Sequence, residues 1–233
     1  MLREHSHDMD AQNWYRSGRA KAQKGEWLDA RMDFDEALIL DPTFVKAYMI
    51  RAYVRRKLND YDGAAKDYSE AIKVDPKLAD AYDGRGQVYS RLGDMDKALA
   101  DYNRAIQLGV TDKATTHFNR ATVHAKRGSL ELAIDDYAEA IRYNPKFGDA
   151  FHSRALLYAR KEETLRALAD FEQALQIGTS DIVRTLLARA AVHEVRETWA
   201  AAAADYEAVL KRDPRNEPAR KGIEALKSRQ PSP

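Results

Sequence analysis

The sequence contains no cysteine. Disulfide bonds, thiolate zinc sites and cysteine nucleophiles are therefore excluded, and the absence agrees with a reducing compartment. The chain also lacks any run of about 18 apolar residues, the length that a membrane-spanning helix needs. Residues 1–10 have no apolar segment of the kind found in signal peptides. We therefore expect no membrane insertion and a cytoplasmic location.

Charge of one sign is missing as well. Lysine and arginine number 38, aspartate and glutamate number 37, and the net charge is +1. This balance argues against a nucleic-acid partner recruited by overall charge. The 233 residues, 44% of them hydrophobic, can bury a substantial core in one large domain or one continuous array.

The pattern that is present is a repeated segment. One copy is residues 61–76, YDGAAKDYSEAIKVDP, and five more copies begin at Trp27, Met95, Leu130, Thr164 and Trp199. In all six copies the fourth residue is Ala, the seventh is Asp, the eighth is aromatic and the twelfth is Ile or Leu. Such self-similarity indicates an array of structural repeats.

Each copy has the spacing of an amphipathic helix. Ala64, Tyr68, Ala71 and Ile72 recur at intervals of three and four residues, so they collect on one helical face. Pro76 then ends the helix, because proline disfavours helical geometry in the preceding residue. One such helix is marginal alone, so stacked copies are expected to bury each other's apolar faces.

Aligning the copies divides the chain into six repeats of 34 or 35 residues, each an A helix, a turn and a B helix. Residues 1–10 are predicted to be flexible, 217–229 to form a capping helix and 230–233 to be disordered. The predicted repeats are 11–44, 45–78, 79–113, 114–147, 148–182 and 183–216. Residues that tolerate a positive φ fall at the A–B turns of the first four repeats: Gly25, Asn59, Gly93 and Gly128.

These features resemble the tetratricopeptide repeat family. The first repeat carries the residues of that family's pattern: Trp14, Gly18, Gly25, Ala30, Phe34, Ala37 and Pro42. The resemblance implies an all-α, right-handed superhelical solenoid whose A helices line a concave, non-enzymatic binding face. The third and fifth repeats depart from the pattern, since both lack the proline and have one extra residue. Glu162 and Glu197 stand where the family has the turn glycine.

No catalytic, cofactor-binding or metal-binding set emerges from the sequence. His5 and His7 are spaced for a metal, but further ligands are lacking and we interpret them as part of a frayed terminus. His117, His124 and His193 lie where the family places bulky core residues, so packing is favoured over metal ligation. The chain is therefore predicted not to be an enzyme.

An arginine and an aspartate recur in register. Arginine occupies position 7 of repeats two to six, and aspartate occupies position 23 of every repeat. Because the first repeat alone lacks the arginine, we predict that each aspartate pairs with the arginine of the following repeat. Unrelated solvated charges are the alternative. The predicted pairs are Asp33–Arg51, Asp67–Arg85, Asp101–Arg120, Asp136–Arg154 and Asp170–Arg189.

The resemblance implies a scaffold that holds a partner's peptide or helix in its concave groove; the alternative is a self-assembling repeat module. By family geometry, positions 2, 5, 6, 9, 12 and 13 of the A helices face the groove. They carry nine basic and four acidic residues, a net charge of +5, concentrated in repeats one and two. We predict a site there for an acidic peptide with apolar anchors, or else an ordinary solvated basic face. The predicted site residues are Tyr15, Arg16, Arg19, Lys46, Met49, Tyr53, Arg56 and Lys57.

Overall fold

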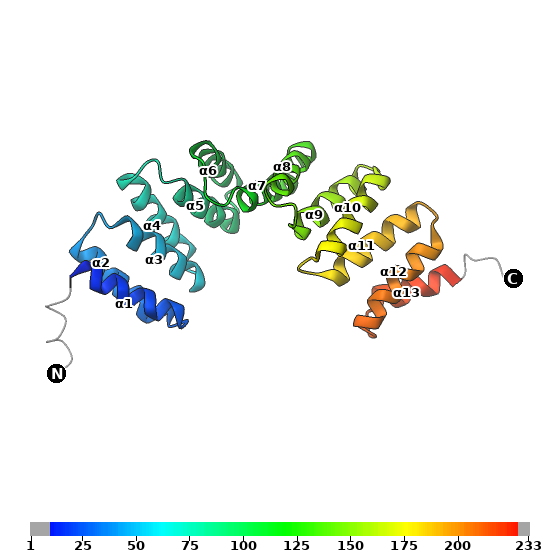
Figure 1. Cartoon of the computed structure of the whole chain (residues 1–233), viewed down its shortest axis with the longest axis horizontal. Coiled ribbons are helices and arrows are strands. Elements are labelled where there is room, and N and C mark those ends of the chain that lie inside the picture. Colours follow the sequence, from blue (N-terminus) through cyan, green and yellow to red (C-terminus); the bar gives the residue numbers. More distant parts are fainter. Residues whose placement is uncertain (1–9, 228–233) are drawn as a thin grey trace. The chain divides into compact units, whose positions relative to one another are not determined.

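The computed structural model describes residues 10–227, and in that range all the regular secondary structure is helical (Figure 1). The helices are α1 (Ala11–Gln23), α2 (Trp27–Leu40), α3 (Val45–Lys57), α4 (Tyr61–Val74), α5 (Ala79–Leu92), α6 (Met95–Leu108), α7 (Lys113–Lys126), α8 (Leu130–Tyr143), α9 (Gly148–Arg160), α10 (Thr164–Ile177), α11 (Ile182–Val195), α12 (Trp199–Arg212) and α13 (Glu217–Lys227). Among these, none has both the length and the apolar character that crossing a membrane requires. The all-α prediction is confirmed.

The chain divides into two compact units, residues 1–123 (unit 1) and 124–233 (unit 2). In unit 1, α1 packs on α2, α3 on α4 and α5 on α6, while α2–α3 and α4–α5 contacts join successive pairs. In unit 2 the same alternation runs from α8 to α13. The odd-numbered helices up to α11 are the A helices, and A-to-A contacts between α1 and α3 and between α9 and α11 place neighbouring A helices side by side.

The predicted apolar helical face forms the core of each pair. Ala64 and Ala71 are fully buried, and Tyr68 between them is 4% exposed. Helix α5 approaches this ring so closely that a Cβ on Gly84 would lie 2.5 Å from it. The small residues therefore set the distance between helices, and the aromatic ring fills the space that they leave.

The turns between A and B helices use the left-handed backbone that the glycines predicted. Asn59 adopts it with a φ of 60°, as do the two glutamates that replace glycine in unit 2. Glu162 has a φ of 61° and Glu197 a φ of 58°. For a side chain with a Cβ this conformation costs about 1–2 kcal/mol, so the turn geometry is imposed by the packing of the two helices it joins.

Helix α13 covers the end of unit 2. Ala219 and Leu226 are buried against α12, and Gly222 lies so near Tyr206 that a Cβ would meet its ring at 2.4 Å. Helix α13 thus covers apolar side chains of α11 and α12, as a covering helix at the end of a repeat array does. Residues 228–229 of the predicted cap, the 230–233 tail and the His5–His7 pair lie outside the described residues.

Candidate binding groove

The recurring arginine and aspartate do pair, but the pairs that the structure shows lie within one repeat, in repeats two, three, five and six. Arg85 Nε and Nη2 donate to the two carboxylate oxygens of Asp101, each at 2.8 Å. The pairs that the structure shows are Arg51–Asp67, Arg85–Asp101, Arg154–Asp170 and Arg189–Asp205. The predicted pairing of each aspartate with the next repeat is wrong. Positions 7 and 23 face each other across the antiparallel A and B helices of one repeat.

The first repeat solves the lack of arginine differently. Ser17 Oγ donates to Asp33 Oδ2 at 2.6 Å, and Lys21 Nζ lies 2.7 Å from Asp33 Oδ1. Lys21 reaches the carboxylate from one helical turn further along α1. Asp33 therefore has partners within its own repeat, and the missing arginine is no evidence for pairing with the next one.

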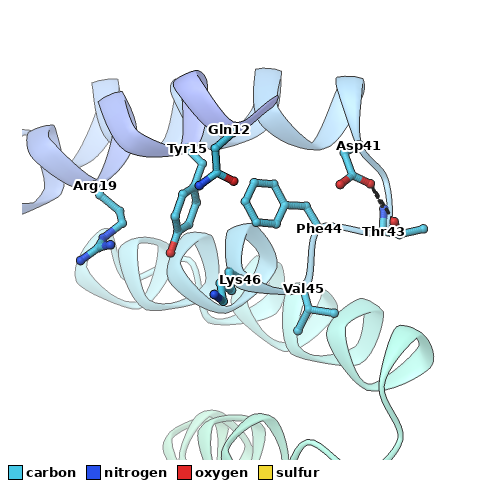
Figure 2. Close-up of a pocket in the computed structure, with 8 residues that line it drawn as sticks. All are labelled: Gln12, Tyr15, Arg19, Asp41, Thr43, Phe44, Val45 and Lys46. Atoms are coloured by element: carbon cyan, nitrogen blue, oxygen red, sulfur yellow. Dashed lines mark hydrogen bonds between the residues drawn. The ribbon is translucent and has the colours of Figure 1, made fainter. Parts of the chain in front are cut away.

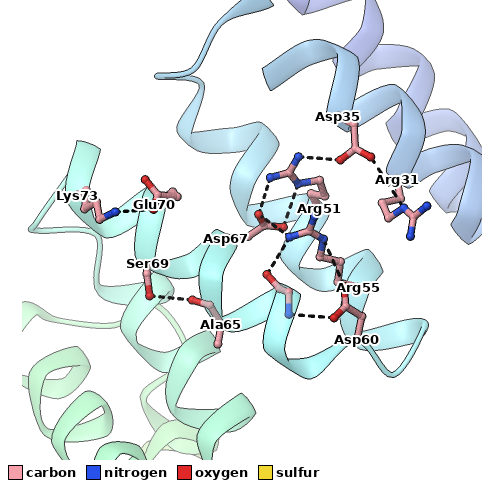
Figure 3. Close-up of polar contacts among 11 residues, drawn as sticks. Arg31, Asp35, Arg51, Arg55, Asp60, Ala65, Asp67, Ser69, Glu70 and Lys73 are labelled. Carbon is pink, nitrogen blue, oxygen red and sulfur yellow. Dashed lines mark hydrogen bonds and ion pairs between the residues drawn. The ribbon is translucent and has the colours of Figure 1, made fainter. Parts of the chain in front are cut away.

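In unit 1 the same arginines also reach the preceding repeat. Arg51 Nη1 donates to Asp35 at 2.7 Å, as Figure 3 shows, and Arg85 Nη1 donates to Ser69 Oγ at 2.9 Å. Arg120 Nη1 donates to Asn103 Oδ1 at 2.6 Å. The three acceptors share repeat position 25. Arg51 and Arg85 thus each join three helices of unit 1, and Arg120 joins α7 to α6. In unit 2 position 25 is Ala138 near Arg154, which has no side-chain acceptor, and Glu172 near Arg189, which acts on that arginine through its charge.

Burial limits the net stability that these pairs provide. Asp67 is 1% exposed, and burial raises the pKa of this carboxyl above its ordinary value although Arg51 and Arg55 lie against it. The cost of removing the carboxylate from water therefore offsets much of the attraction. The arrangement fixes the orientation of the helices through bidentate geometry.

All four acidic residues predicted in the groove accept hydrogen bonds from their own chain. Asp80 accepts from the backbone and side chain of Thr111 at 2.9 and 2.8 Å, and Asp149 accepts from the backbone of Ser180 at 2.7 Å. Both donors lie in the longer, proline-free turns, so these aspartates tie the extra residue to an A helix. Asp83 accepts from Thr116 and Gln87, and Glu194 accepts from Tyr206.

A basic pocket lies at the start of α1 and α3, with a cavity volume of about 380 Å³. Figure 2 shows Tyr15 and Arg19 reaching down from α1 toward α3, beside Lys46. Among the described residues, neither cation forms an ion pair, and Arg19 lies 5.8 Å from the Tyr15 ring. Asp41 is occupied by Thr43. The lining residues, here named the basic pocket, are Gln12, Tyr15, Arg19, Asp41, Thr43, Phe44, Val45 and Lys46.

The structure brings together only part of the predicted site. Tyr15, Arg19 and Lys46 line the basic pocket, and Arg16 is exposed beside them on α1. Tyr15 is only 6% exposed, which corrects its prediction as an exposed anchor: its ring packs against Phe44, with centroids 4.8 Å apart.

The other predicted residues lie further along α3 than Lys46 and outside the basic pocket. Tyr53 is 45% exposed and packs edge-on against Trp27 at 6.1 Å, with Lys57 over both rings. Met49 is half-buried, and Arg56 donates to Gln87 at 2.8 Å. The basic pocket therefore does not include Met49, Tyr53, Arg56 and Lys57.

A second cavity, in unit 2, was missed by the sequence analysis. It lies between the ends of α9 and α11, has a volume of about 730 Å³ and reaches the ring of Phe171. The available signal was a set of small residues at groove positions: Ala159, Ala188 and Ala191. The lining, here named the apolar pocket, is Leu156, Ala159, Arg160, Glu162, Thr164, Phe171, Ala188, Ala191, Val192 and Val195.

The histidines within residues 10–227 are buried or partly buried in the helix packing. His117 is 6% exposed, and His124 and His193 are partly buried. His152 is also buried, with Nδ1 2.9 Å from Thr185 Oγ1. Within residues 10–227, no group of histidine, aspartate and glutamate side chains is arranged to hold a metal ion.

Comparisons with known proteins agree with this architecture. A family model described as "Tetratricopeptide repeat" matches residues 15–71 and 118–182, more than half of the chain. A second model with the same description matches residues 77–146, and one described as "TPR repeat" matches residues 52–93.

Individual relatives are more distant. The photosystem I assembly protein Ycf3 of Cyanophora paradoxa is 32% identical over 63 residues, which are 27% of this chain and 36% of that protein. The chain thus spans about a third of that curated relative. The crystal structure of PilW, a type IV pilus biogenesis factor, has a TM-score of 0.78 at 18% identity, covering 91% of this chain and 97% of that one. The structure of YrrB, a TPR protein with an unusual peptide-binding site, has a TM-score of 0.69 at 18% identity, covering 82% and 97%.

Proposed function

The chain belongs to the tetratricopeptide repeat family, whose members generally act as protein-interaction scaffolds, and we propose that it binds an acidic segment of a partner protein at the basic pocket of unit 1. The partner's carboxylates meet Arg19 and Lys46, while apolar side chains of the segment lie against Phe44, which lines the same pocket. YrrB, a TPR protein described by its peptide-binding site, is a structural neighbour that supports this class of function.

One observation supports the proposal above the others. The groove's acidic residues are occupied by hydrogen bonds within the chain, whereas Arg16, Arg19 and Lys46 hold no carboxylate among the described residues. Unpaired cations around a cavity attract an anionic ligand, steer its approach and add contact energy once water is displaced.

The test uses a fluorescent-labelled acidic peptide, acetyl-Glu-Phe-Leu-Glu amide, and the double substitution Arg19→Glu with Lys46→Glu. We expect affinity at low salt to fall by about tenfold or more and its salt dependence to flatten, because the reversed charges repel the peptide. The matched control, Lys66→Glu with Arg104→Glu, makes the same change of net charge at exposed positions of α4 and α6. Equal losses in the two double variants would contradict a site at the basic pocket.

Self-assembly is supported by a separate feature, the outer face of α2. Leu28, Met32 and Ile39 lie on one side of that helix, and with Leu40 they are 54–69% exposed. The same repeat positions on α4 carry polar residues: Asp62, Lys66 and Lys73. Exposed apolar stripes of this kind mark interaction surfaces, and a second copy of α2 would be an apolar partner for it.

Light scattering coupled to size exclusion tests this second candidate. We expect the wild-type mass to rise with concentration and the Leu28→Lys, Ile39→Lys variant to remain a monomer. Lys66→Leu on α4 is a control for a general change in surface polarity. A wild-type monomer at every concentration would exclude self-assembly through α2 and leave the basic pocket untouched.

A further inference from the structure

The apolar pocket exists because three groove positions of unit 2 carry alanine. Ala159, Ala188 and Ala191 occupy repeat positions 12, 6 and 9. At the matching place between the first two repeats the residues are Ala22, Ile50 and Tyr53, of which the last two are large. Where unit 1 carries Ile50 and Tyr53, unit 2 has a cavity that reaches Phe171 of α10.

The mouth of the pocket exposes apolar surface to solvent. Val195 at the end of α11 is 73% exposed, whereas Val192 one turn earlier is 5% exposed. A volume of about 730 Å³ lies within the usual range of ligand pockets, roughly 300–1,000 Å³. An apolar cavity of this size is suited to a bulky apolar side chain, whose burial is the favourable step.

The charges at the mouth favour an anion next to that side chain. Arg160 lines the pocket and forms no ion pair within residues 10–227, and Arg196 Nη1 beside it donates only to the hydroxyl of Thr164, at 3.1 Å. The one carboxylate in the lining is Glu162. Two arginines and one glutamate at the mouth therefore lack an oppositely charged partner within the described residues, which leaves an excess of positive charge.

The neighbouring Glu163 does not neutralise these arginines, because it already has cationic partners. Glu163 is held by Lys161 at 2.8 Å and by Arg166 at 2.7 Å. Each carboxylate oxygen of Glu163 therefore already has a cationic partner. The guanidinium groups at the mouth are thus the available hydrogen-bond donors for a ligand.

We propose that the apolar pocket is a second binding site, which takes a bulky apolar side chain of a peptide segment and holds a neighbouring carboxylate of that segment at Arg160. This inference rests on the proposed scaffold function and specifies its ligand. The partner chemistry is an apolar residue, aromatic or branched, adjacent to an acidic one. A segment with acidic residues alone has no apolar side chain to fill the space beside the three alanines, so we expect it to bind this pocket weakly.

The experiment follows backbone amide signals of residues 188–195 by NMR during titration with three capped tetrapeptides. They are Glu-Phe-Leu-Glu, Glu-Ala-Ala-Glu, which lacks the apolar side chains, and Gln-Phe-Leu-Gln, which lacks the charges. We expect saturable shifts with the first, about tenfold weaker binding with the second, and binding about two- to fivefold weaker with the third.

Two substitutions test the pocket itself. Ala191→Trp fills the space, and the Glu-Phe-Leu-Glu affinity is expected to fall about tenfold. Ala204→Trp places the same side chain at an exposed position of α12 and serves as its control. Arg160→Gln is expected to weaken Glu-Phe-Leu-Glu two- to fivefold and to leave Gln-Phe-Leu-Gln unchanged; Arg220→Gln, at an exposed site on α13, is its control.

The outcomes separate this site from the basic pocket. Equal shifts of residues 188–195 with the Phe-Leu and Ala-Ala peptides would overturn the proposal, as would equal affinities for Ala191→Trp and Ala204→Trp. Val195→Ser, at a position open to solvent, provides a second variant if the tryptophan perturbs folding, and undiminished binding by it also counts against the pocket. Shifts confined to residues 12–46 would support the basic pocket and contradict this one.

Discussion

The two units use one repeat design to build different surfaces. Unit 1 has the smaller cavity, about 380 Å³, whose Arg19 and Lys46 form no ion pair with any described residue, and its Arg51 and Arg85 bridge adjacent repeats. Unit 2 has the larger cavity, about 730 Å³, with alanines and valines in its lining. Its Arg154 and Arg189 each donate to the aspartate of their own repeat and not to the preceding one, within the described residues. In both units the recurring pattern of core residues therefore gives similar helix pairs. The residues at the groove positions and at position 25 differ between the units without changing that packing.

The largest expected effect concerns the arginines. Arg85→Leu leaves Asp101 buried without its cation, and Arg154→Leu does the same to Asp170, so each is expected to cost about 3–5 kcal/mol. Arg85 also bridges to Ser69, and its loss is expected to cost about 1 kcal/mol more. Urea unfolding, monitored by hydrogen exchange in each unit, measures the stability costs of the two substitutions. Adding Asp101→Leu to Arg85→Leu should recover much of the loss, and equal costs for the two arginines would show that the bridge adds nothing.

Helix α13 gives the next effect. Leu226 is 3% exposed against the end of unit 2, so Leu226→Ala is expected to cost about 2–4 kcal/mol through lost burial and a cavity. Hydrogen exchange should accelerate in residues 183–216 and stay unchanged in unit 1. Truncation after Asn216 should do more in the same segment and reduce solubility. Unchanged protection of 183–216 in the truncated chain would mean that α13 is no cap; Leu28→Ala, at an exposed site, is the control for Leu226→Ala.

A pH effect of opposite sign distinguishes the units. His152 in unit 2 and Asp83 in unit 1 occupy the same repeat position. Burial lowers the pKa of His152 below 6.5, and Arg184 lowers it further, while Asp149 and Asp181 oppose the change. Below pH 6.5 the unfolded chain therefore binds more protons than the folded one, and unit 2 loses stability as the pH falls, by up to about 1.4 kcal/mol per pH unit.

Burial raises the pKa of Asp83 above 3.8, so the folded unit 1 takes up a proton before its unfolded chain does. As the pH falls toward the raised pKa of Asp83, this residue therefore increases the free energy of unfolding of unit 1. Over a falling pH, His152 instead decreases the free energy of unfolding of unit 2. Hydrogen exchange in unit 2 at about pH 7 and about pH 5.5 measures the His152 effect, and a series in unit 1 from about pH 7 down to about pH 4 measures the Asp83 effect. His152→Asn should flatten the response of unit 2, and an unflattened response would assign it to other groups, His193 among them, whose pKa is also lowered by burial.

The smallest effect concerns the turns. Glu197→Gly removes the Cβ from a residue with a φ of 58°, and unit 2 is expected to gain about 0.5–1 kcal/mol, since glycine's greater unfolded-state freedom offsets part of the relieved strain. Gly93→Ala, at a φ of 84° in unit 1, should have the opposite sign by a similar amount. Thermal unfolding of each variant measures both changes. A destabilised Glu197→Gly protein would show that the glutamate side chain stabilises its turn.

The sequence by itself determined the repeat length, the A and B helices and the buried side of each. These depend on local spacing: Ala64, Tyr68 and Ala71 share a face in any α-helix, and a turn that demands a positive φ selects glycine or asparagine. The basic character of the first two repeats was also readable, since Arg19 and Lys46 lie at predicted groove positions and line the basic pocket.

Only the tertiary structure decided which charges meet and where space is left. The sequence recurrence is the same whether an aspartate pairs within its repeat or with the next repeat. Because the first repeat has no arginine, Asp33 favoured pairing with the next repeat, but the structure shows Ser17 and Lys21 as its partners. The apolar pocket likewise depends on side chains from three helices leaving a common volume, which no single helix pattern records. Local periodicity fixes which side of a helix is buried, and only the packed neighbours fix what that side touches.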